Sequence, residues 1–103
     1  MYSLIEFDTI KSVLQNIQVI LTTIKGSDPH RPEFGLDIAA FQDKPLTALD
    51  KGKVKAEVVE AIETWEPRAK VSQIDITYTK NGLLARLTID IEGAKIKQDV
   101  RIY

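Results

Sequence analysis

The sequence predicts an α+β fold in which two main helices, with room for a short third one, pack on a three-stranded antiparallel β-meander. Apolar residues recur at helical spacing in two stretches of the first two thirds of the chain. In the last third they occupy every second position, and tight-turn dipeptides separate the alternating stretches. At 103 residues the chain fits one domain, residues 1–103, whose core needs no disulfide or metal.

The first helix is expected to begin at Asp8 or Thr9, which are good N-cap residues, and to run to about Ile24. One face of this helix carries an apolar stripe of Ile10, Val13, Leu14, Ile17, Ile20, Leu21 and Ile24. Gly26 is a natural stop, since glycine adopts the left-handed conformation without steric cost. Val19 falls on the opposite, polar face.

An ordered loop, residues 26–35, is predicted next, because it carries two prolines and a glycine at each end. Phe34 is expected in the core, whereas Arg31 and Glu33 are left to solvent or to a partner. His30 is the only histidine, and with no cysteine in the chain a zinc site has no ligand set. We therefore expect no metal and no cofactor.

The second helix is predicted within the stretch from Val54 to Lys70 and stops at Glu66-Pro67-Arg68, because Pro67 lacks a backbone N–H and favours an extended Glu66. A short helix or turn is expected before it, between Leu36 and Leu49, with Asp50 as a cap. The apolar face consists of Val54, Val58, Ala61, Ile62 and Trp65.

Three strands follow. Ile74, Ile76 and Tyr78 alternate with polar residues, and Asn81-Gly82 is a strong hairpin signal. The next strand, residues 83–91, has the clearest alternation, and Glu92-Gly93 makes a second turn. The last strand is expected to run to the final residue and to form an edge of the sheet. Outward charges protect such an edge from unwanted pairing, but another chain can still add a strand to it.

Composition excludes several classes of function. A net charge of −1, from 14 basic and 15 acidic side chains, gives no electrostatic basis for binding nucleic acid or an anionic membrane. The N-terminal residues lack the pattern of a signal peptide, and no apolar run approaches the roughly 20 residues of a membrane-spanning helix. The absence of cysteine fits a reducing compartment. We therefore expect a soluble, cytoplasmic protein.

Four carboxylates spaced three residues apart on the second helix are the one catalytic pattern to weigh: Glu57, Glu60, Glu63 and Glu66. Side chains at this spacing lie about 5–6 Å apart at Cβ, which resembles the carboxylate pair of a retaining glycosidase. However, Glu60 and Glu63 point away from the apolar face, and a glycosidase acid needs a cleft that raises its pKa. No nucleophilic triad or phosphate-binding loop is present, so no enzyme activity and no small-molecule substrate are expected.

Glu66 and Arg68 point to the same side of the chain across Pro67, because residues two apart share a face in an extended segment. A carboxylate at a helix C-terminus also needs a nearby cation. The two side chains either pair with each other, in a local salt bridge worth about 0–1 kcal/mol if exposed, or offer an acid and a base to a partner.

Three landmarks occur in order: ILTTIKG (residues 20–26), RPEFG (residues 31–35) and WEPR (residues 65–68), followed by two hairpins. Together they resemble the small baseplate wedge family of contractile phage tails, also called the baseplate W or tail-lysozyme-like family. Relatives occur in type VI secretion baseplates and contractile bacteriocins. The resemblance covers nearly the whole chain, with one departure: Ser27-Asp28 stands where the family often has an acidic or small residue followed by arginine.

The resemblance implies structural assembly. The expected partners are larger wedge proteins and the tail sheath subunit, in a virion tail baseplate assembled in the cytoplasm of the host or producer cell. The implied wedge contacts are Trp65, Glu66, Pro67 and Arg68, together with Arg31, Pro32, Phe34 and Gly35. The alternative for residues 31–35 is a loop that makes no wedge contact and serves only to anchor Phe34 in the core. The implied sheath-pairing edge strand contains Ile96, Val100, Ile102 and Tyr103.

Two alternatives stay open. The lysozyme-like name keeps a peptidoglycan-hydrolysing tail enzyme, which would use the helix carboxylates, as the second hypothesis. The sequence also does not distinguish an infectious phage from a bacteriocin or a secretion apparatus, because the same physical interactions would build the baseplate platform in all three.

Overall fold

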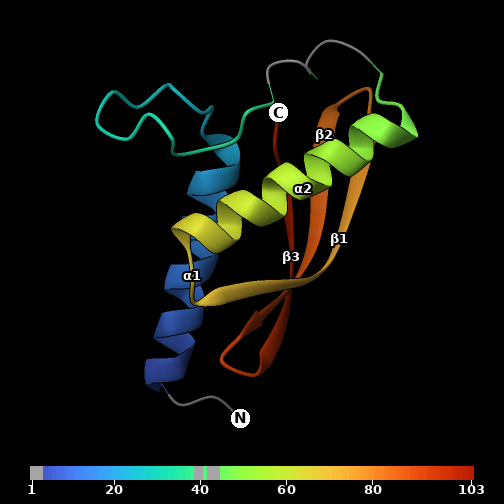
Figure 1. The fold of residues 1–103 in the computed structure, drawn as a ribbon. Helices are drawn as coiled ribbons and strands as arrows, with labels where there is room; N and C mark the ends of the chain where they lie inside the picture. Colours follow the sequence, from blue (N-terminus) through green and yellow to red (C-terminus); the bar gives the residue numbers. More distant parts are fainter. Residues whose placement is uncertain (1–3, 39–40, 42–44) are drawn as a thin grey trace.

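The computed structural model describes residues 4–38, 41 and 45–103. Its elements follow the chain as α1 (Leu4–Thr22), α2 (Ala48–Trp65), β1 (Ala69–Thr79), β2 (Gly82–Ile91) and β3 (Ala94–Arg101). Helix α2 crosses one face of the three-stranded sheet, and α1 stands beside the sheet, next to α2 (Figure 1). The predicted α+β class and helix-covered sheet are confirmed.

The sheet is an antiparallel meander with the order β1-β2-β3, as predicted. The first turn is Lys80-Asn81, one residue before the predicted Asn81-Gly82, because Gly82 is already in β2 and pairs with Thr79. Glu92-Gly93 makes the second turn, as predicted, and Gly82, Glu92 and Gly93 have positive φ. The register pairs Tyr78 with Leu83 and Ile89 with Ile96. One irregularity, a bulge at Ser72, shifts the β1–β2 register between Val71 and Gln73. Strand β1 bends sharply along its length (Figure 1), as bulged strands do.

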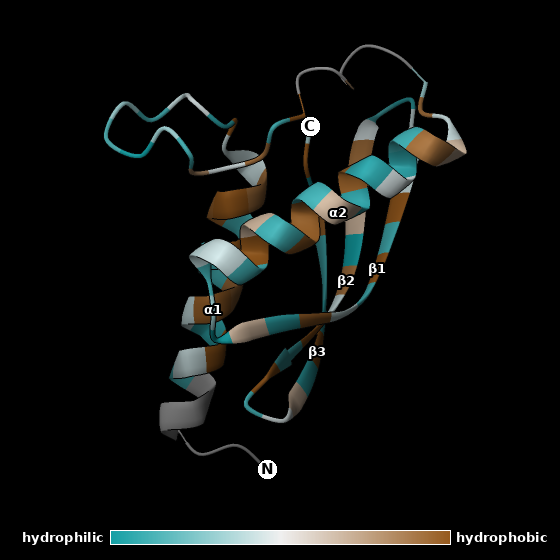
Figure 2. Ribbon diagram, viewed as in Figure 1, coloured by the Kyte–Doolittle hydropathy of each residue, from teal (hydrophilic) through white to brown (hydrophobic). Residues whose placement is uncertain are grey.

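The core lies between the helices and the face of the sheet that they cover. Along each strand brown and teal residues alternate, so that one set of side chains faces the helices (Figure 2). The largest fully buried side chains are Ile17, Ile20, Leu21, Leu36, Ile62, Leu83, Ile89, Ile91, Val13, Val54 and Val58. Phe34 joins this core with 2% of its surface exposed, as predicted, and Val19 is exposed as its place in the helix indicates.

Helix α1 begins earlier and ends earlier than predicted. It starts at Leu4, so Asp8 and Thr9 lie inside it, and it ends at Thr22 instead of continuing toward Gly26. The Thr22 and Thr23 hydroxyls donate to backbone carbonyls one turn back, at 2.7 and 2.6 Å, which offers those carbonyls an alternative to further helix. Beyond them the chain is extended and pairs with Leu36, and Ile24, expected on the apolar stripe, is 49% exposed.

Helix α2 begins six residues before Val54, at Ala48, and its N-cap is Thr47, not Asp50. The Asp50 N–H donates to Thr47 Oγ1 (3.1 Å), and the Thr47 N–H donates to Asp50 Oδ2 (3.2 Å), which forms a capping box. The helix ends at Trp65, immediately before the predicted stop at Glu66-Pro67-Arg68. Of the short helix expected between Leu36 and Leu49, residues 39–40 and 42–44 lie outside the described residues.

Strand β3 forms an edge of the sheet, as predicted, but it ends at Arg101 and not at the last residue. Backbone pairing nevertheless continues, because the Ile102 N–H donates to Leu83 O (2.8 Å) and the Leu83 N–H donates to Tyr103 O (3.0 Å). Neither α1 nor α2, within their described residues, is long and apolar enough to cross a membrane.

Candidate functional site

The end of α2 forms a compact turn around Glu66. The Glu66 N–H closes the helix by donating to Ile62 O (2.7 Å), and its carbonyl accepts from the Ala69 N–H (3.1 Å), where β1 begins. Pro67 sits between these bonds and is exposed. The proline therefore occupies a position where no backbone N–H is needed, and it turns the chain from the helix into the sheet.

The Glu66 side chain is buried, with 2% of the residue exposed. Its carboxylate accepts from Arg68 Nη2 (2.6 Å) and Nε (3.0 Å), from the Arg68 backbone N–H (3.4 Å), and from Asn16 Nδ2 of α1 (3.3 Å). The two parallel bonds from one guanidinium are the strong, bidentate form of an ion pair. Glu66 and Arg68 thus pair with each other, and the carboxylate is not open to a partner.

The Arg68 guanidinium lowers the pKa of Glu66 by hydrogen bonding to its ionised form. Burial acts in the opposite direction, and the Asn16 amide adds to the lowering. Glu66 therefore stays ionised, which is the reverse of what a general acid of a glycoside hydrolase requires.

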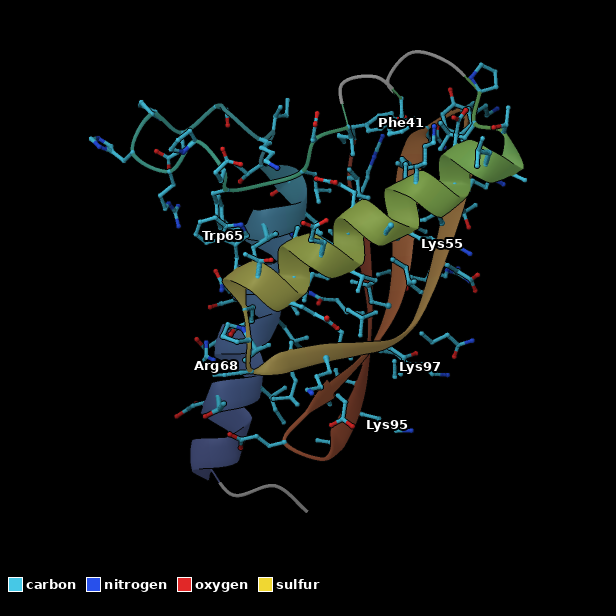
Figure 3. All side chains as sticks on the ribbon, viewed as in Figure 1. Phe41, Lys55, Trp65, Arg68, Lys95 and Lys97 are labelled. Atoms are coloured by element: carbon cyan, nitrogen blue, oxygen red, sulfur yellow. The ribbon has the colours of Figure 1, made fainter. Side chains whose placement is uncertain are left out.

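Arg68 presents the outer side of this pair. Its side chain is 46% exposed, while its inner edge holds the buried carboxylate. Trp65 and Arg68 lie on the same side of the molecule at the end of α2, and Arg68 lies next to α1 (Figure 3). The guanidinium is therefore fixed in place yet available to an outside group.

The loop of residues 26–35 packs directly against this turn through an aromatic pair. The Phe34 and Trp65 rings meet edge to face, with centroids 5.2 Å apart and an interplanar angle of 77°. Arg31, which was expected in solvent or on a partner, stacks over the Phe34 ring, with its Cζ 4.0 Å from the ring centroid. Asp28 holds that arginine by a 3.1 Å ion pair, so loop and turn form one surface.

Gly35 closes the loop where no other residue fits. Its φ is +107°, and a Cβ at this position would lie 2.4 Å from Thr23 O. That carbonyl accepts from the Leu36 N–H, and Leu36 O accepts from the Lys25 N–H, both at 2.9 Å. Gly35 lets the two backbones approach closely. Pro32 is exposed at the loop surface, and Glu33 pairs with Lys25 at 3.5 Å.

The other helix carboxylates are either exposed or bonded to the backbone. Glu57 Oε1 accepts from the Asp37 backbone N–H (3.0 Å), and Glu60 and Glu63 are exposed. Glu57 and Glu60 line a hollow of about 130 Å³ between α2 and the loop, where Trp65 also lies. Within the described part of the chain, no cluster of three His, Cys, Asp or Glu residues has a geometry for a metal ion.

The residues expected to form the sheath-pairing edge mostly face inward. Val100 and Ile102 are buried in the core, and Ile96 packs against it. Tyr103 uses its carbonyl to accept from Leu83 and its hydroxyl to donate to Phe41 O (3.1 Å). Val100 and Ile102 therefore give their side chains to the core of this chain.

Asn16 is the site residue that our reading of the sequence missed. It donates both to Glu66 Oε1 and to Trp65 O, at 3.3 and 3.5 Å, and so ties α1 to the end of α2. An asparagine inside a helix has poor intrinsic propensity, which was the available signal, but the sequence does not say which element it meets.

Comparison of the sequence with known proteins identifies a family match. The sequence profile of the family described as baseplate wedge protein gp25 matches residues 8–100. Baseplate wedge protein gp25 of Enterobacteria phage T4 is 34% identical over 59 residues, which are 57% of this chain and 45% of the T4 protein. Baseplate protein W of Escherichia phage P2 is 29% identical over 84 residues, or 82% of this chain and 70% of the P2 protein. The match thus spans less than half of the T4 relative.

Two solved structures share the fold. A chain in a cryo-EM structure of the postcontracted pyocin R2 baseplate is 31% identical, with a TM-score of 0.68, over 81% of this chain and 85% of that one. A crystal structure of a proposed tail lysozyme from Geobacter sulfurreducens has a TM-score of 0.82 at 22% identity, over 100% of this chain and 93% of that one. At that identity the likeness shows the fold alone, because one fold hosts many functions.

Proposed function

The chain belongs to the family of baseplate wedge protein gp25, and from this premise we propose that it is a structural component of a contractile-tail baseplate wedge. It joins larger wedge proteins in the tail baseplate, which assembles in the cytoplasm of the host or producer cell. It then offers the platform on which sheath polymerisation begins. Catalysis is not part of this role, because the most buried helix carboxylate is paired and ionised.

The observation that supports wedge docking is the difference in exposure between the two members of the Glu66–Arg68 pair. Glu66 is buried and bonded to two elements, whereas Arg68 is nearly half exposed. Glu66 therefore positions the guanidinium, and Arg68 makes the contact, together with exposed Pro67. A pre-positioned arginine loses little conformational entropy on binding, and its remaining N–H groups suit a carboxylate or carbonyl of a partner.

The loop extends the same docking surface. Arg31 is 52% exposed in its side chain and is held over Phe34, which in turn is held by Trp65. The proposed wedge surface thus carries two arginines, Arg31 and Arg68, each fixed by an acidic residue of this chain. A wedge partner with exposed carboxylates would complement it.

The test of docking is a pull-down of Arg68→Ala and wild type from cells that express the neighbouring tail genes. We expect the folded variant to lose the large wedge proteins. Arg86→Ala is the matched control, because Arg86 is 65% exposed and pairs with Asp99 at 3.7 Å on another part of the surface. Full retention of wedge proteins by Arg68→Ala would reduce the turn to a local structural element.

Arg68→Ala also leaves the buried Glu66 carboxylate without its cation, which can destabilise the chain. A second variant, Glu66→Gln with Arg68→Gln, removes both charges and keeps hydrogen-bonding groups of similar size. Circular dichroism of each variant establishes that the fold is intact. Loss of wedge proteins from both folded variants supports docking through Arg68.

Sheath initiation is proposed to use the free edge of β3 through strand addition, in which backbone hydrogen bonds supply the affinity. Truncation from Val100 onward would not test this cleanly, because it would also remove the buried Val100 and Ile102 side chains from the core. A proline on the outer side of β3 is the better probe.

A further inference from the structure

One side of β3 carries backbone groups that no described residue uses. The Ile102 N–H points to β2, because it donates to Leu83 O, and alternate residues back along β3 face the same way. The N–H and C=O groups of Lys95, Lys97 and Asp99 therefore point away from β2. Among the described residues, none of these groups has a backbone partner.

A groove runs beside this edge, between α1 and β3. We call it the α1–β3 groove, and it is lined by Ile10, Lys11, Leu14, Gln15, Gln18 and Gln98. Its volume is about 230 Å³. An apolar cavity of about 150 Å³ can hold benzene, so the groove has room for a leucine-sized side chain.

Gln98 breaks the apolar pattern of β3 at the wall of this groove. It stands on the core-facing side between Ile96 and Val100, where alternation favours an apolar residue. Its Nε2 donates to Leu14 O (3.3 Å), but its Oε1 is buried without a hydrogen-bond partner among the described residues. A buried acceptor left unpaired is unfavourable, and a donor from a bound segment would remove that penalty.

The unpaired outer edge of β3 and the α1–β3 groove lie in register with each other. Gln98 directs its own backbone groups to β2, so an antiparallel strand added at the edge would face it in a non-hydrogen-bonded pair. In such pairs the side chains stand closest together. A side chain of the added strand would therefore enter the α1–β3 groove directly opposite Gln98 and against Leu14.

The opposite face of this edge is basic. Lys95, Lys97 and Arg101 project there with Asp99, and Lys95 and Lys97 point away from α1 (Figure 3). Asp99 already lies 3.7 Å from Arg86. Lys95 stands directly opposite Asp90 on β2, whereas Lys97 stands opposite Thr88. An acidic side chain on the outward face of an added strand would therefore complement Lys97.

We propose that the α1–β3 groove is the side-chain subsite of the strand-addition edge and that it selects the strand that binds there. The occupant is an extended segment of a neighbouring chain. It carries an apolar residue for Leu14, a neighbouring hydrogen-bond donor for Gln98, and an acidic residue over Lys97. This inference rests on the proposed role of β3 in sheath initiation.

The test compares tails assembled with three variants of the full chain, with sheath subunits as the probe. Gln18→Trp fills the groove from its exposed rim, while Val19→Trp is the control, because Val19 is exposed on α1 but does not line the groove. Lys97→Pro removes an outward N–H from the edge itself, which β2 does not use. If Lys97→Pro does not fold, Asp99→Pro makes the same change one pair along.

We expect Gln18→Trp and Lys97→Pro to reduce sheath per baseplate at least tenfold, with wedge proteins retained and Val19→Trp normal. Normal sheaths with Gln18→Trp but not with Lys97→Pro would overturn the groove and leave strand addition standing. Normal sheaths with Lys97→Pro would overturn strand addition, and the groove proposal with it.

Discussion

The rings of Phe34 and Trp65 meet edge to face at 5.2 Å, so that the loop after α1 and the turn after α2 are held as one unit. The contact places the Arg31–Phe34 stack beside the Glu66–Arg68 pair. A displacement of the loop would therefore also move Trp65 and disturb the turn after α2. The stability of this unit can be measured without a partner.

Replacing Phe34 with leucine removes the aromatic pair but keeps an apolar side chain in the core. We expect the free energy of unfolding to fall by about 1–2 kcal/mol, because an aromatic pair adds roughly 0.5–1.5 kcal/mol beyond its buried area. Trp65 is the only tryptophan, so urea denaturation followed by its fluorescence reports on this contact. Arg31→Gln, which spares the ring pair, should cost less; an equal loss would point to the cation over Phe34 instead.

Glu66→Gln should destabilise the chain by about 1–3 kcal/mol, because it takes the charge from a buried acceptor of several hydrogen bonds. Glu63→Gln on the same helix is the control. Glu63 is exposed, and a substitution there should stay within about 0.5 kcal/mol. Equal stability of the two variants in chemical denaturation would contradict the structural importance of the pair.

The same pair predicts a specific acid sensitivity. The pKa of Glu66 is lowered in the folded chain, so the unfolded chain takes up a proton first as pH falls below the ordinary value of 4.5. The contribution of the pair is therefore complete above that value and is lost progressively below it. Asp28, whose pKa is also lowered by its bonds to His30 and Arg31, acts in the same direction.

The difference in unfolding free energy between wild type and Glu66→Gln isolates the Glu66 part, because Asp28 is common to both. This difference should be constant from about pH 6 to 8 and should shrink below pH 4.5. A difference that grows toward acid would mean that the sign of the pKa shift is wrong.

Two glycine substitutions should have opposite signs. Gly35→Ala forces a Cβ against Thr23 O at a φ of +107° and should cost more than about 2 kcal/mol. Gly52→Ala lies within α2, where a Cβ meets nothing within 4 Å, and should stabilise by about 0.5–1 kcal/mol. Thermal melts of both variants test this. A neutral Gly35→Ala would show that the loop can open at little cost.

The hydrolase alternative has a direct test. The double variant Glu60→Gln and Glu63→Gln should enter baseplates at the wild-type level, since both side chains are exposed. Purified wild-type chain should not clear a suspension of peptidoglycan. Clearing that the double variant lacks would restore the enzyme reading.

The sheet and the end of α2 were predictable from local chemistry. Alternation of apolar residues, the Asn81-Gly82 hairpin signal and the stop at Pro67 each act over a few residues, so the sequence displays them directly. The hairpin signal is one residue out of step, because the turn itself is Lys80-Asn81. The start of α2 was missed because its first two turns contain Asp50, Lys51 and Lys53, which hide the apolar period. The Thr47–Asp50 capping box was the available signal.

The three-dimensional site was less predictable, because it depends on contacts between elements far apart in the chain. Phe34 was expected in the core, but nothing in the sequence names Trp65 as its neighbour. Likewise, the Glu66–Arg68 pairing was one of two open readings. The structure decides between them because Asn16 and the core bury the carboxylate. Periodicity describes which face is apolar, and it does not describe which faces meet.

The bulge at Ser72 has a consequence for how this chain tolerates insertions and deletions. Ala69 and Val71 face the core before it, and Ile74 and Ile76 do so after it, with Ser72 and Gln73 both exposed between them. Removing Ser72 would leave every other β1 side chain on its present face, whereas removing a residue elsewhere in the strand would turn part of the core outward. Homologues that differ in length by one residue within β1 should therefore differ at Ser72, because this residue is skipped in the β1–β2 register and its loss does not disturb the alternation of inward and outward side chains.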